Sequence, residues 1–335
     1  MSKHHSEVAE FLLLTLYICS RQIPGLTAPR RVCIVDNEQE SGRSNPLKLL
    51  VTGANGMLGH VLWEEAGNHG VDVTGTVRRI PEGHERLFEK GNILLGIDVE
   101  GEDAMAGVLD QVRPDVVVNC IGIVKQSPAI QDSIKSIRVN SLFPHVLAMK
   151  CADVGSRLIH MSTDCVFSGS KGYYKESDKP DSADFYGLSK LMGEPKGRNV
   201  LVLRTSMIGP ELGTSQGLLE WFIAQRGKTV PGFVNAIFNG FYTRSLARLV
   251  LQMALNFTSI SGVRHLGAEA ISKYELLRKI RDRCHLSIEV VPDRTVELDR
   301  SLDSTLIRNE CNLDMPSWEE MADQLAYDLR KEGRL

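Results

Sequence analysis

Residues 49–59 read LLVTGANGMLG, a short apolar run followed by three glycines spaced three residues apart. The apolar run is typical of a buried strand, and the sequence after it has the apolar spacing of a helix. In such a strand–turn–helix unit, Gly53 permits the tight turn, Gly56 lets the backbone approach phosphates, and Gly59 lets helix and strand pack closely. Free N–H groups and the helix dipole favour anions at the helix N-terminus. The stretch therefore predicts a binding site for the pyrophosphate of a dinucleotide.

Alternating strands and helices continue along the chain from this unit. Strands are expected at residues 47–52, 71–77, 93–97, 116–120, 158–163 and 200–204, and helices at 57–68, 102–112, 134–154 and around Tyr186. This alternation predicts an α/β fold of the Rossmann type, a doubly wound parallel sheet with helices on both faces. Pro144 should kink the helix at 134–154, because proline has no N–H group to donate.

We expect three segments: an N-terminal extension at 1–46, an NAD(P)-binding domain at 47–208, and a smaller, mostly helical lobe at 209–335. The lobe can return one strand or helix to the main sheet. The extension contains an apolar run at 11–19 that is too short to cross a bilayer. A poorly ordered extension or a misassigned start is favoured over a helix packed on the core. A targeting signal is least favoured, because no small-residue cleavage site follows.

Tyr186 and Lys190 stand four residues apart on an expected helix, so they share one face. A nearby ammonium group stabilises phenolate and lowers the pKa of a tyrosine. We therefore expect Lys190 to lower the pKa of Tyr186 and make it a better proton donor at neutral pH. Thr163 ends the strand at 158–163, upstream of this helix.

Four further motifs carry a resemblance to a known family. They are STDCVFSG at 162–169, YYKESDKP at 173–180, FYGLSKLMGE at 185–194 and VLRTSMIGP at 202–210. Together with the glycine spacing, they resemble dTDP-4-dehydrorhamnose reductases, the RmlD-like family of the extended short-chain dehydrogenase/reductase superfamily. The resemblance extends over residues 47–330 and is sparse beyond 208.

The resemblance implies an oxidoreductase that transfers a hydride from NADPH to a ketone. In this scheme Tyr186 donates the proton, Thr163 binds the carbonyl oxygen and Lys190 holds the cofactor ribose. The implied substrate is a nucleotide-activated 4-keto-6-deoxy sugar, used in nucleotide-sugar and cell-surface polysaccharide biosynthesis. A cytoplasmic location fits this role, and a homodimer is compatible with it.

The end of the second strand favours NADPH over NADH. Enzymes of this architecture that prefer NAD place an acidic residue there for the ribose 2′-hydroxyl. Here Asp72 opens the strand, and Arg78 and Arg79 close it. A guanidinium suits a 2′-phosphate because it offers paired, charged hydrogen bonds. Besides Gly53, Gly56, Gly59, Arg78 and Lys190, the expected cofactor contacts are Asn55, Met57, Asp98, Val99, Asn119, Gly122 and Asn140.

Residues 232–243, GFVNAIFNGFYT, cluster aromatic residues, asparagines and glycines ahead of a helix. The expected substrate contacts are Asp164, Phe233, Asn239 and Arg244, with Arg244 as a partner for the diphosphate. This stretch departs from the family pattern, which leaves the sugar and the nucleotide open. A second departure is Pro195, which should end the Tyr186 helix early.

Two alternatives remain open beside the reductase. The regulatory beta subunit of methionine adenosyltransferase shares this fold and much of the motif set, so a non-catalytic, NADP-binding role is compatible with the triad. A nucleotide-sugar epimerase is the second alternative. A dehydratase is disfavoured because no glutamate follows Asp164, where dehydratases commonly carry acidic residues.

Composition narrows the remaining classes of function. The chain has 335 residues, of which 24% are charged, and a net charge of −3, so nothing favours a nucleic-acid or membrane partner. Seven scattered cysteines without a Cys-x-x-Cys pair are typical of free thiols in a reducing compartment. No set of metal ligands is legible.

Overall fold

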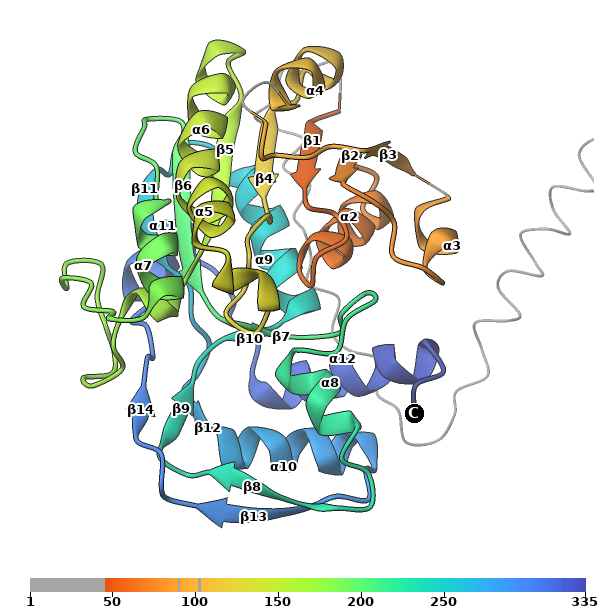
Figure 1. The fold of residues 1–335 in the computed structure, drawn as a ribbon, viewed down its shortest axis with the longest axis vertical. Helices are drawn as coiled ribbons and strands as arrows, with labels where there is room; N and C mark the ends of the chain where they lie inside the picture. The colour runs from red at the N-terminus through yellow and green to blue at the C-terminus, as the bar shows by residue number, and fades with distance from the viewer. Residues whose placement is uncertain (1–45, 90, 102–103) are drawn as a thin grey trace, which may run out of the picture. The chain divides into compact units, whose positions relative to one another are not determined.

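Seven parallel strands form the central sheet, in the order β3-β2-β1-β4-β5-β6-β11 (Figure 1). The structure, a computed structural model, describes residues 46–335 apart from 90 and 102–103. The strands of the sheet are β1 (Lys48–Thr52), β2 (Asp72–Val77), β3 (Asn92–Leu95), β4 (Val116–Asn119), β5 (Arg157–Thr163), β6 (Val200–Thr205) and β11 (Gly262–His265). The order reverses between β1 and β4, and such sheets bind ligands at the carboxyl ends of the strands beside this point.

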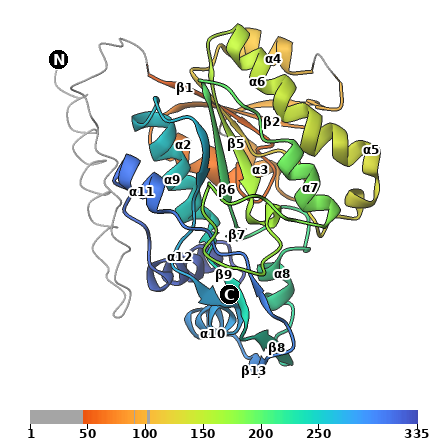
Figure 2. The same ribbon diagram turned by 90° about the vertical axis from the view of Figure 1, so that its left-hand side faces the viewer.

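Helices cover both faces of the sheet (Figure 2). One face carries α2 (Gly59–Asn68), α9 (Thr243–Asn256) and α11 (Thr305–Cys311). The other carries α4 (Ala104–Val112), α5 (Ser133–Ser136), the π-helical turn η2 (Ile137–Leu142), α6 (Phe143–Asp153) and α7 (Phe185–Met192). Short helical turns are α3 (Glu85–Phe88), η1 (Pro128–Gln131) and η3 (Asp164–Val166). Because both faces are covered, β4 is buried along its whole length, as its valine run indicates.

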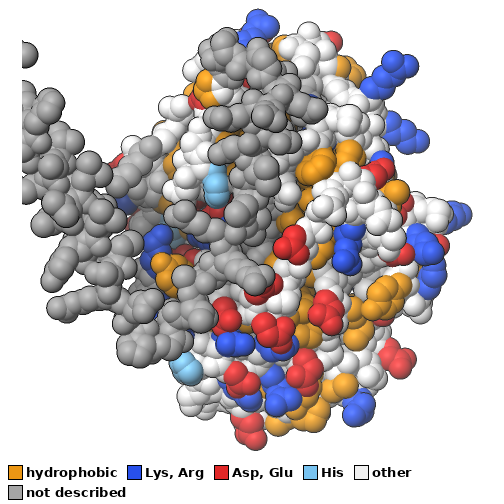
Figure 3. Space-filling model, turned by 180° about the vertical axis from the view of Figure 1, so that it is seen from behind, with side chains coloured by type: hydrophobic (Ala, Val, Ile, Leu, Met, Phe, Trp, Pro, Cys, Tyr) orange, Lys and Arg blue, Asp and Glu red, His pale blue; other side chains and the backbone are white. Residues whose placement is uncertain are grey.

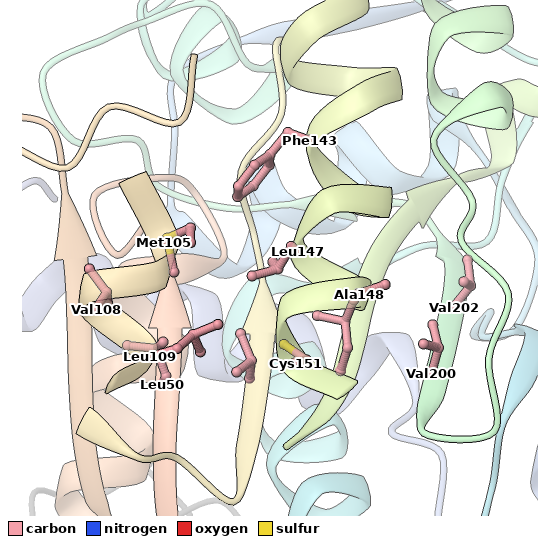
Figure 4. Packing of buried hydrophobic residues seen from close by; sticks show 12 residues of the cluster. Leu50, Met105, Val108, Leu109, Phe143, Leu147, Ala148, Cys151, Val200 and Val202 are labelled. Atoms are coloured by element: carbon pink, nitrogen blue, oxygen red, sulfur yellow. The ribbon is translucent and has the colours of Figure 1, made fainter. Parts of the chain in front are cut away.

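A hydrophobic core fills the space between the sheet and the helices α4 and α6 (Figure 4). Leu109 of α4 and Leu147 of α6 are fully buried against strand residues such as Leu50, Val117 and Leu158. Burying each such side chain contributes about 1.5–3 kcal/mol. This core holds the central strands rigidly, and their carboxyl ends carry the site described below.

The helix expected at 134–154 is present as α5, η2 and α6 in direct succession. The π-helical turn ends immediately before the first turn of α6, which contains Pro144. Proline lacks an N–H group and its ring clashes with the carbonyl four residues before it, and the wider π turn accommodates both. The kink expected at Pro144 is thus a local change of helix type.

The C-terminal lobe contains more helix than strand, but it also holds small sheets that the sequence did not predict. Its helices are α8 (Leu218–Ile223), α10 (Lys273–Cys284) and α12 (Trp318–Lys331). Its sheets pair β8 (Thr229–Phe233) with β13 (Glu289–Asp293), and β9 (Ala236–Phe238) with β12 (Ile271–Ser272) and β14 (Leu298–Asp299). A further pair, β7 (Met207–Ile208) and β10 (Phe241–Tyr242), lies where the chain leaves β6.

The predicted doubly wound α/β fold is confirmed by this sheet. β11 returns from the second half of the chain to the edge of the sheet beside β6.

Acidic and basic side chains are interspersed over the lower part of the face in Figure 3, with no field of a single sign. The expectations for residues 1–45 lie outside the described residues.

Candidate active site

The glycine-rich turn follows β1 and leads into α2 at the carboxyl edge of the sheet. Gly53 has φ +74°, in the left-handed region that favours glycine. A Cβ at Gly59 would lie 2.1 Å from the Gly53 carbonyl oxygen, so a side chain there would separate helix from strand. No side chain caps the N-terminus of α2. The turn therefore presents an uncapped helix end to an anion.

The loop after β2 lies beside this turn. The Asn55 amide donates to the Arg79 carbonyl oxygen at 3.0 Å, which joins the two loops. Arg78 and Arg79 are exposed. Neither guanidinium forms a hydrogen bond or an ion pair with any residue that the structure describes. Both charges are available to a ligand.

A segment of the second half of the chain, residues 209–217, crosses in front of these two loops. A Cβ at Gly217 would lie 3.0 Å from Met57 Cε, and one at Gly213 would lie 2.8 Å from Pro81 Cβ. Sequence reasoning missed this segment, because only Gly209 and Pro210 belong to a motif and the segment lies about 150 residues from the turn that it touches. It closes one side of the expected nucleotide site.

Two further predicted cofactor contacts follow β3, at the same carboxyl edge of the sheet as the glycine-rich turn. Asp98 is exposed and accepts the Glu100 N–H at 3.1 Å, and Val99 is half-buried. They lie where a base at the end of the nucleotide could be held, and their role stays a prediction.

Asn119 does not have the predicted role. Its side chain is fully buried. It accepts from Thr52 Oγ1 at 2.9 Å and from the Ile121 N–H at 3.1 Å, and it hydrogen-bonds His160 Nδ1 at 3.0 Å. With its amide engaged on every side, Asn119 ties β1, β4 and β5 together and is not directed at a cofactor.

The three residues of the expected triad lie together at the carboxyl end of β5. The Tyr186 phenol lies close to Thr163, whose hydroxyl opposes the rise of the phenol pKa. Thr163 Oγ1 also donates to Asp164 Oδ1 at 3.1 Å and accepts the Cys165 N–H at 3.1 Å. The Asp184 carboxylate caps α7 by accepting the Gly187 N–H at 2.8 Å, which fixes the helix that carries the tyrosine.

The ammonium group of Lys190 is buried and donates to the Met161 carbonyl oxygen at 2.8 Å. Burial lowers the pKa of Lys190 to about 8. The pKa of Tyr186 is raised, not lowered as predicted, because burial outweighs the other influences on the phenol. A tyrosine with a raised pKa is fully protonated at neutral pH, so it can still donate a proton.

Gly122 and Asn140 line the space beside Lys190. A Cβ at Gly122 would lie 3.5 Å from Asn140 Oδ1 and 3.7 Å from Lys190 Nζ, so a larger residue would narrow this space. Asn140 is fully buried in the π-helical turn. Its amide accepts the Ile123 N–H at 2.8 Å and donates to the Ile123 oxygen at 3.0 Å and to Ser189 Oγ at 3.1 Å. It joins the segment after β4 to α7.

The predicted substrate contact Asp164 lies next to the triad. Burial raises the pKa of its carboxyl group, against the opposing charges of Arg300 and Lys273. Arg300 comes from the lobe, and its guanidinium donates to the Phe167 carbonyl oxygen at 2.9 Å. As a single arginine without a motif, Arg300 gave no signal in the sequence. Two cations of the lobe, Lys273 and Arg300, thus lie near Asp164.

Residues 47–330 match the model of the family described as RmlD substrate binding domain. The chain belongs to this family. The low-salt glycan biosynthesis reductase Agl14 of Haloferax volcanii, itself described as probable, is 30% identical over 230 residues, which cover 66% of this chain and 74% of that protein. Methionine adenosyltransferase 2 subunit beta of Danio rerio is 31% identical over 271 residues, which cover 73% of this chain and 76% of that protein.

A solved structure shows the same fold. It is dTDP-4-dehydrorhamnose reductase of Bacillus anthracis in complex with NADP, with a TM-score of 0.71, 21% identity, and coverage of 85% of this chain and 99% of that chain. The RmlD assignment confirms the resemblance that the four motifs carry.

In this RmlD-family chain Arg244 does not reach the expected diphosphate position. Its guanidinium pairs with Glu65 Oε1 at 2.5 Å, Asp328 Oδ2 at 2.7 Å and Glu64 Oε2 at 2.9 Å. Arg248 adds a contact to Glu65 at 2.8 Å. We call these five residues the junction cluster, since they join α2, α9 and α12. All the donors of Arg244 face carboxylates, so the prediction for it is wrong.

Asn239 is also engaged elsewhere. It is buried and donates to the Leu302 carbonyl oxygen at 2.9 Å, and a Cβ at Gly267 would lie 2.4 Å from its amide nitrogen. It therefore holds loops of the lobe together, which corrects its expected contact with substrate. Phe233 is half-buried at the end of β8, and its role stays a prediction.

A second ionic feature of this chain lies behind the triad. Arg204 of β6 forms a bidentate pair with Glu194, with Nε–Oε1 at 2.8 Å and Nη2–Oε2 at 2.7 Å. Both side chains are buried, with exposed fractions of 6% and 7%. We call it the catalytic-side pair. Both residues belong to motifs quoted above, but the sequence does not show that they contact each other.

No group of three or more His, Cys, Asp or Glu side chains within residues 46–335, apart from 90 and 102–103, could hold a metal ion. Among the helices in that part of the chain, none has the length and apolar character that a bilayer crossing requires.

Proposed function

We propose that this protein is an NADPH-dependent reductase of a nucleotide-activated 4-keto-6-deoxy sugar. The observation that carries the proposal is the convergence of Thr163, Tyr186 and Lys190 at the carboxyl end of β5, beside the switch point of the sheet. The relatives support it, since they include dTDP-4-dehydrorhamnose reductases and a glycan biosynthesis reductase.

The residues present fit a dinucleotide. The glycine-rich turn and the uncapped α2 would hold the pyrophosphate, while Asp98 and Val99 would contact the base. Arg78 would pair with a 2′-phosphate, which favours NADPH over NADH. The B. anthracis structure contains NADP, in line with this choice. Bound there, the nicotinamide would supply the hydride that reduces the ketone.

The chain's own side chains would orient the ketone and move one proton. Thr163 Oγ1 would donate a hydrogen bond to the carbonyl oxygen, and Tyr186 would give its phenolic proton to the developing alkoxide. Lys190, charged and fixed by Met161, would stabilise the phenolate that remains. Placement and electrostatics are thus the contributions of the protein.

The cationic charge near Asp164 supports an anionic, diphosphate-linked substrate. Lys273 of the lobe replaces Arg244 as the candidate for the diphosphate contact, because the guanidinium of Arg300 already contacts Phe167, Cys165 and Asp184. Binding energy from the nucleotide and diphosphate would position the keto carbon, so free sugars should be poor substrates. Such biosynthesis belongs in a reducing cytoplasm, which fits the five free cysteines of the described residues. A homodimer stays a prediction.

The test is NADPH oxidation with dTDP- and UDP-linked 4-keto-6-deoxy sugars, compared with the free sugars and with simple ketones. Oxidation with the nucleotide-linked ketoses alone is the expected result. Turnover of simple ketones at a similar rate would exclude the proposed substrate class.

One other function has a specific observation in its favour. The match to the methionine adenosyltransferase subunit of D. rerio covers 73% of the chain, against 66% for the reductase Agl14 and 54% for the dTDP-4-dehydrorhamnose reductase of Burkholderia thailandensis. If NADPH binds tightly and no keto sugar is turned over, a regulatory subunit becomes the better proposal. A pull-down with a methionine adenosyltransferase catalytic subunit then tests it.

A further inference from the structure

Three consecutive residues of β5 hold three parts of the candidate site. The Met161 carbonyl oxygen accepts from Lys190 at 2.8 Å, Ser162 Oγ donates to Glu194 Oε1 at 2.6 Å, and Thr163 lies close to the Tyr186 phenol. These three partners belong to α7 or follow it directly. Hydrogen bonds therefore join the end of β5 to the end of α7 at two successive residues, and a third residue lies beside the tyrosine.

Glu194 is the point at which this junction is tied to the rest of the sheet. Arg204 holds its carboxylate from β6, and the same guanidinium lies 3.3 Å from His265 Nε2 and 5.3 Å from the centre of the Phe167 ring. A Cβ at Gly193 would lie 1.8 Å from the Asn140 carbonyl oxygen, so the chain is also pressed against η2. Glu194 has little freedom to move.

The charges around Lys190 indicate a second role for Glu194. The groups that face the ammonium are Glu194 after α7, Cys120 after β4 and His160 of β5. Burial raises the pKa of Cys120 to about 12 and lowers that of His160 well below its ordinary value, so both are neutral near pH 7. Glu194 supplies the negative charge among them.

The groups that face Glu194 itself are the cationic Arg204 of β6 and His265 of β11. Glu176 faces His265. Burial lowers the pKa of His265, so it adds no charge near neutral pH. Glu194 balances Arg204 and acts on Lys190 from the end of the same helix.

We propose that Glu194 is a positioning residue of the catalytic site. Fixed by Ser162 and Arg204, its carboxylate holds the end of α7 against β5 and keeps Lys190 in its charged form. The inference rests on the proposed reductase function, which it deepens by assigning a residue that touches neither substrate nor cofactor.

The test compares Glu194→Gln with Glu310→Gln. Glu310 of α11 forms a bidentate pair with Arg264 of the edge strand β11 at 2.6 and 2.8 Å, a pair of the same geometry that is more exposed than Arg204–Glu194. In protein labelled with ¹³Cε-lysine, the Lys190 signal is assigned by Lys190→Arg and titrated by NMR. We expect Glu194→Gln to lower the titration midpoint of Lys190 by about one pH unit or more, and Glu310→Gln to leave it unchanged.

Turnover gives the second readout. The fall in kcat at alkaline pH should move to lower pH in Glu194→Gln by the same interval, about tenfold at the affected pH. If Glu194→Gln does not fold, the double variant Glu194→Gln, Arg204→Met removes both charges and should show a shift in the same direction, smaller because the opposing charge of Arg204 is removed as well. Its control is Glu310→Gln, Arg264→Met.

Ser162→Ala separates the two roles, since it keeps the ion pair and removes one attachment. We expect lower kcat with an unshifted Lys190 midpoint. An unshifted midpoint in Glu194→Gln and in its double variant would overturn the inference, even if turnover fell. A wild-type protein that turns over no keto sugar would instead overturn the proposed function, and the NMR titration would still decide the role of Glu194.

Discussion

The two buried clusters of arginine and carboxylate side chains use the same chemistry on opposite faces of the sheet. The catalytic-side pair has one acid and one base and lies behind the triad. The junction cluster has three carboxylates and two guanidiniums and joins α2 to α9 and α12. Position therefore distinguishes them: the first adjoins groups that would move a proton, whereas the second adjoins packed helices alone.

This difference separates catalysis from stability in a way that substitutions can test. A buried ion pair is weak evidence for stability, because desolvation offsets most of the attraction, yet removing one partner leaves an uncompensated charge. Breaking the junction cluster should thus mainly destabilise the fold. Changes beside the catalytic-side pair should mainly alter turnover and its pH dependence.

The largest expected effect lies at the triad. Tyr186→Phe removes the proton donor and keeps the ring, so kcat should fall by about 10²–10⁴. The Tyr186 side chain is half-buried and the substitution keeps its ring, so the melting temperature should change little. NADPH oxidation and thermal unfolding measure the two effects. Full activity in this variant would remove Tyr186 from the mechanism.

Arg244→Met should show the opposite pattern. Removing the guanidinium leaves three carboxylates close together, and we expect a loss of about 3–5 kcal/mol in the free energy of unfolding. Turnover per folded molecule should stay within about threefold, roughly 0.7 kcal/mol in activation free energy. Urea unfolding and NADPH oxidation are the measurements.

The control for Arg244→Met is Arg113→Met, which breaks an exposed pair with Asp110 and should cost about 0–1 kcal/mol. If instead turnover collapsed in Arg244→Met while stability held, Arg244 would have to contact substrate, and the contrast between the two clusters would fail.

The same contrast shows what the sequence could and could not predict. The glycine-rich turn was predictable because local backbone geometry fixes it: Gly59 approaches Gly53 too closely for any side chain. The pairing of Tyr186 with Lys190 was predictable because one turn of α7 separates them. Glu194 and Arg204 meet only because β6 lies beside β5, which no local pattern encodes.

The errors have a related cause. Arg244, Asn119 and Asn239 are polar residues next to motifs, and the sequence does not show that buried partners already satisfy them. The small sheets of the lobe were missed because strands of two to five residues are too short for a periodic pattern. The pKa of Tyr186 was predicted from the charge of Lys190 alone, whereas burial dominates.

Acid should weaken both regions through buried histidines. Burial lowers the pKa of His60, on α2 near Arg244, to about 4, and also lowers that of His265 beside Arg204. The unfolded chain therefore binds protons first, so the stabilising effect is complete above about pH 6.5 and is lost as the pH falls towards 4, by up to about 1.4 kcal/mol per pH unit and histidine.

Urea unfolding between pH 7 and 4 measures this slope. His60→Gln should flatten it. NADPH affinity is measured beside stability, because His60 Nδ1 also hydrogen-bonds the Gly56 carbonyl oxygen of the glycine-rich turn at 2.7 Å. An unchanged slope in His60→Gln would mean that the buried imidazole does not titrate in this interval, and the acid sensitivity would then belong to other groups.

The smallest expected effect concerns the exposed loop after β2, remote from both clusters. Arg78→Asp replaces a partner for a 2′-phosphate with an acceptor for a 2′-hydroxyl, so the preference for NADPH over NADH should fall about tenfold, roughly 1.4 kcal/mol. The control is Arg86→Asp, an equal change of charge at an exposed residue of α3. Titration of each variant with NADPH and with NADH gives its selectivity between the two cofactors. If the charge acts only at long range, the selectivity should change equally in Arg78→Asp and in Arg86→Asp. A selective loss in Arg78→Asp therefore means a direct contact with the phosphate. Equal selectivity in wild type and Arg78→Asp would leave Arg78 as a surface charge and Arg79 as the next candidate.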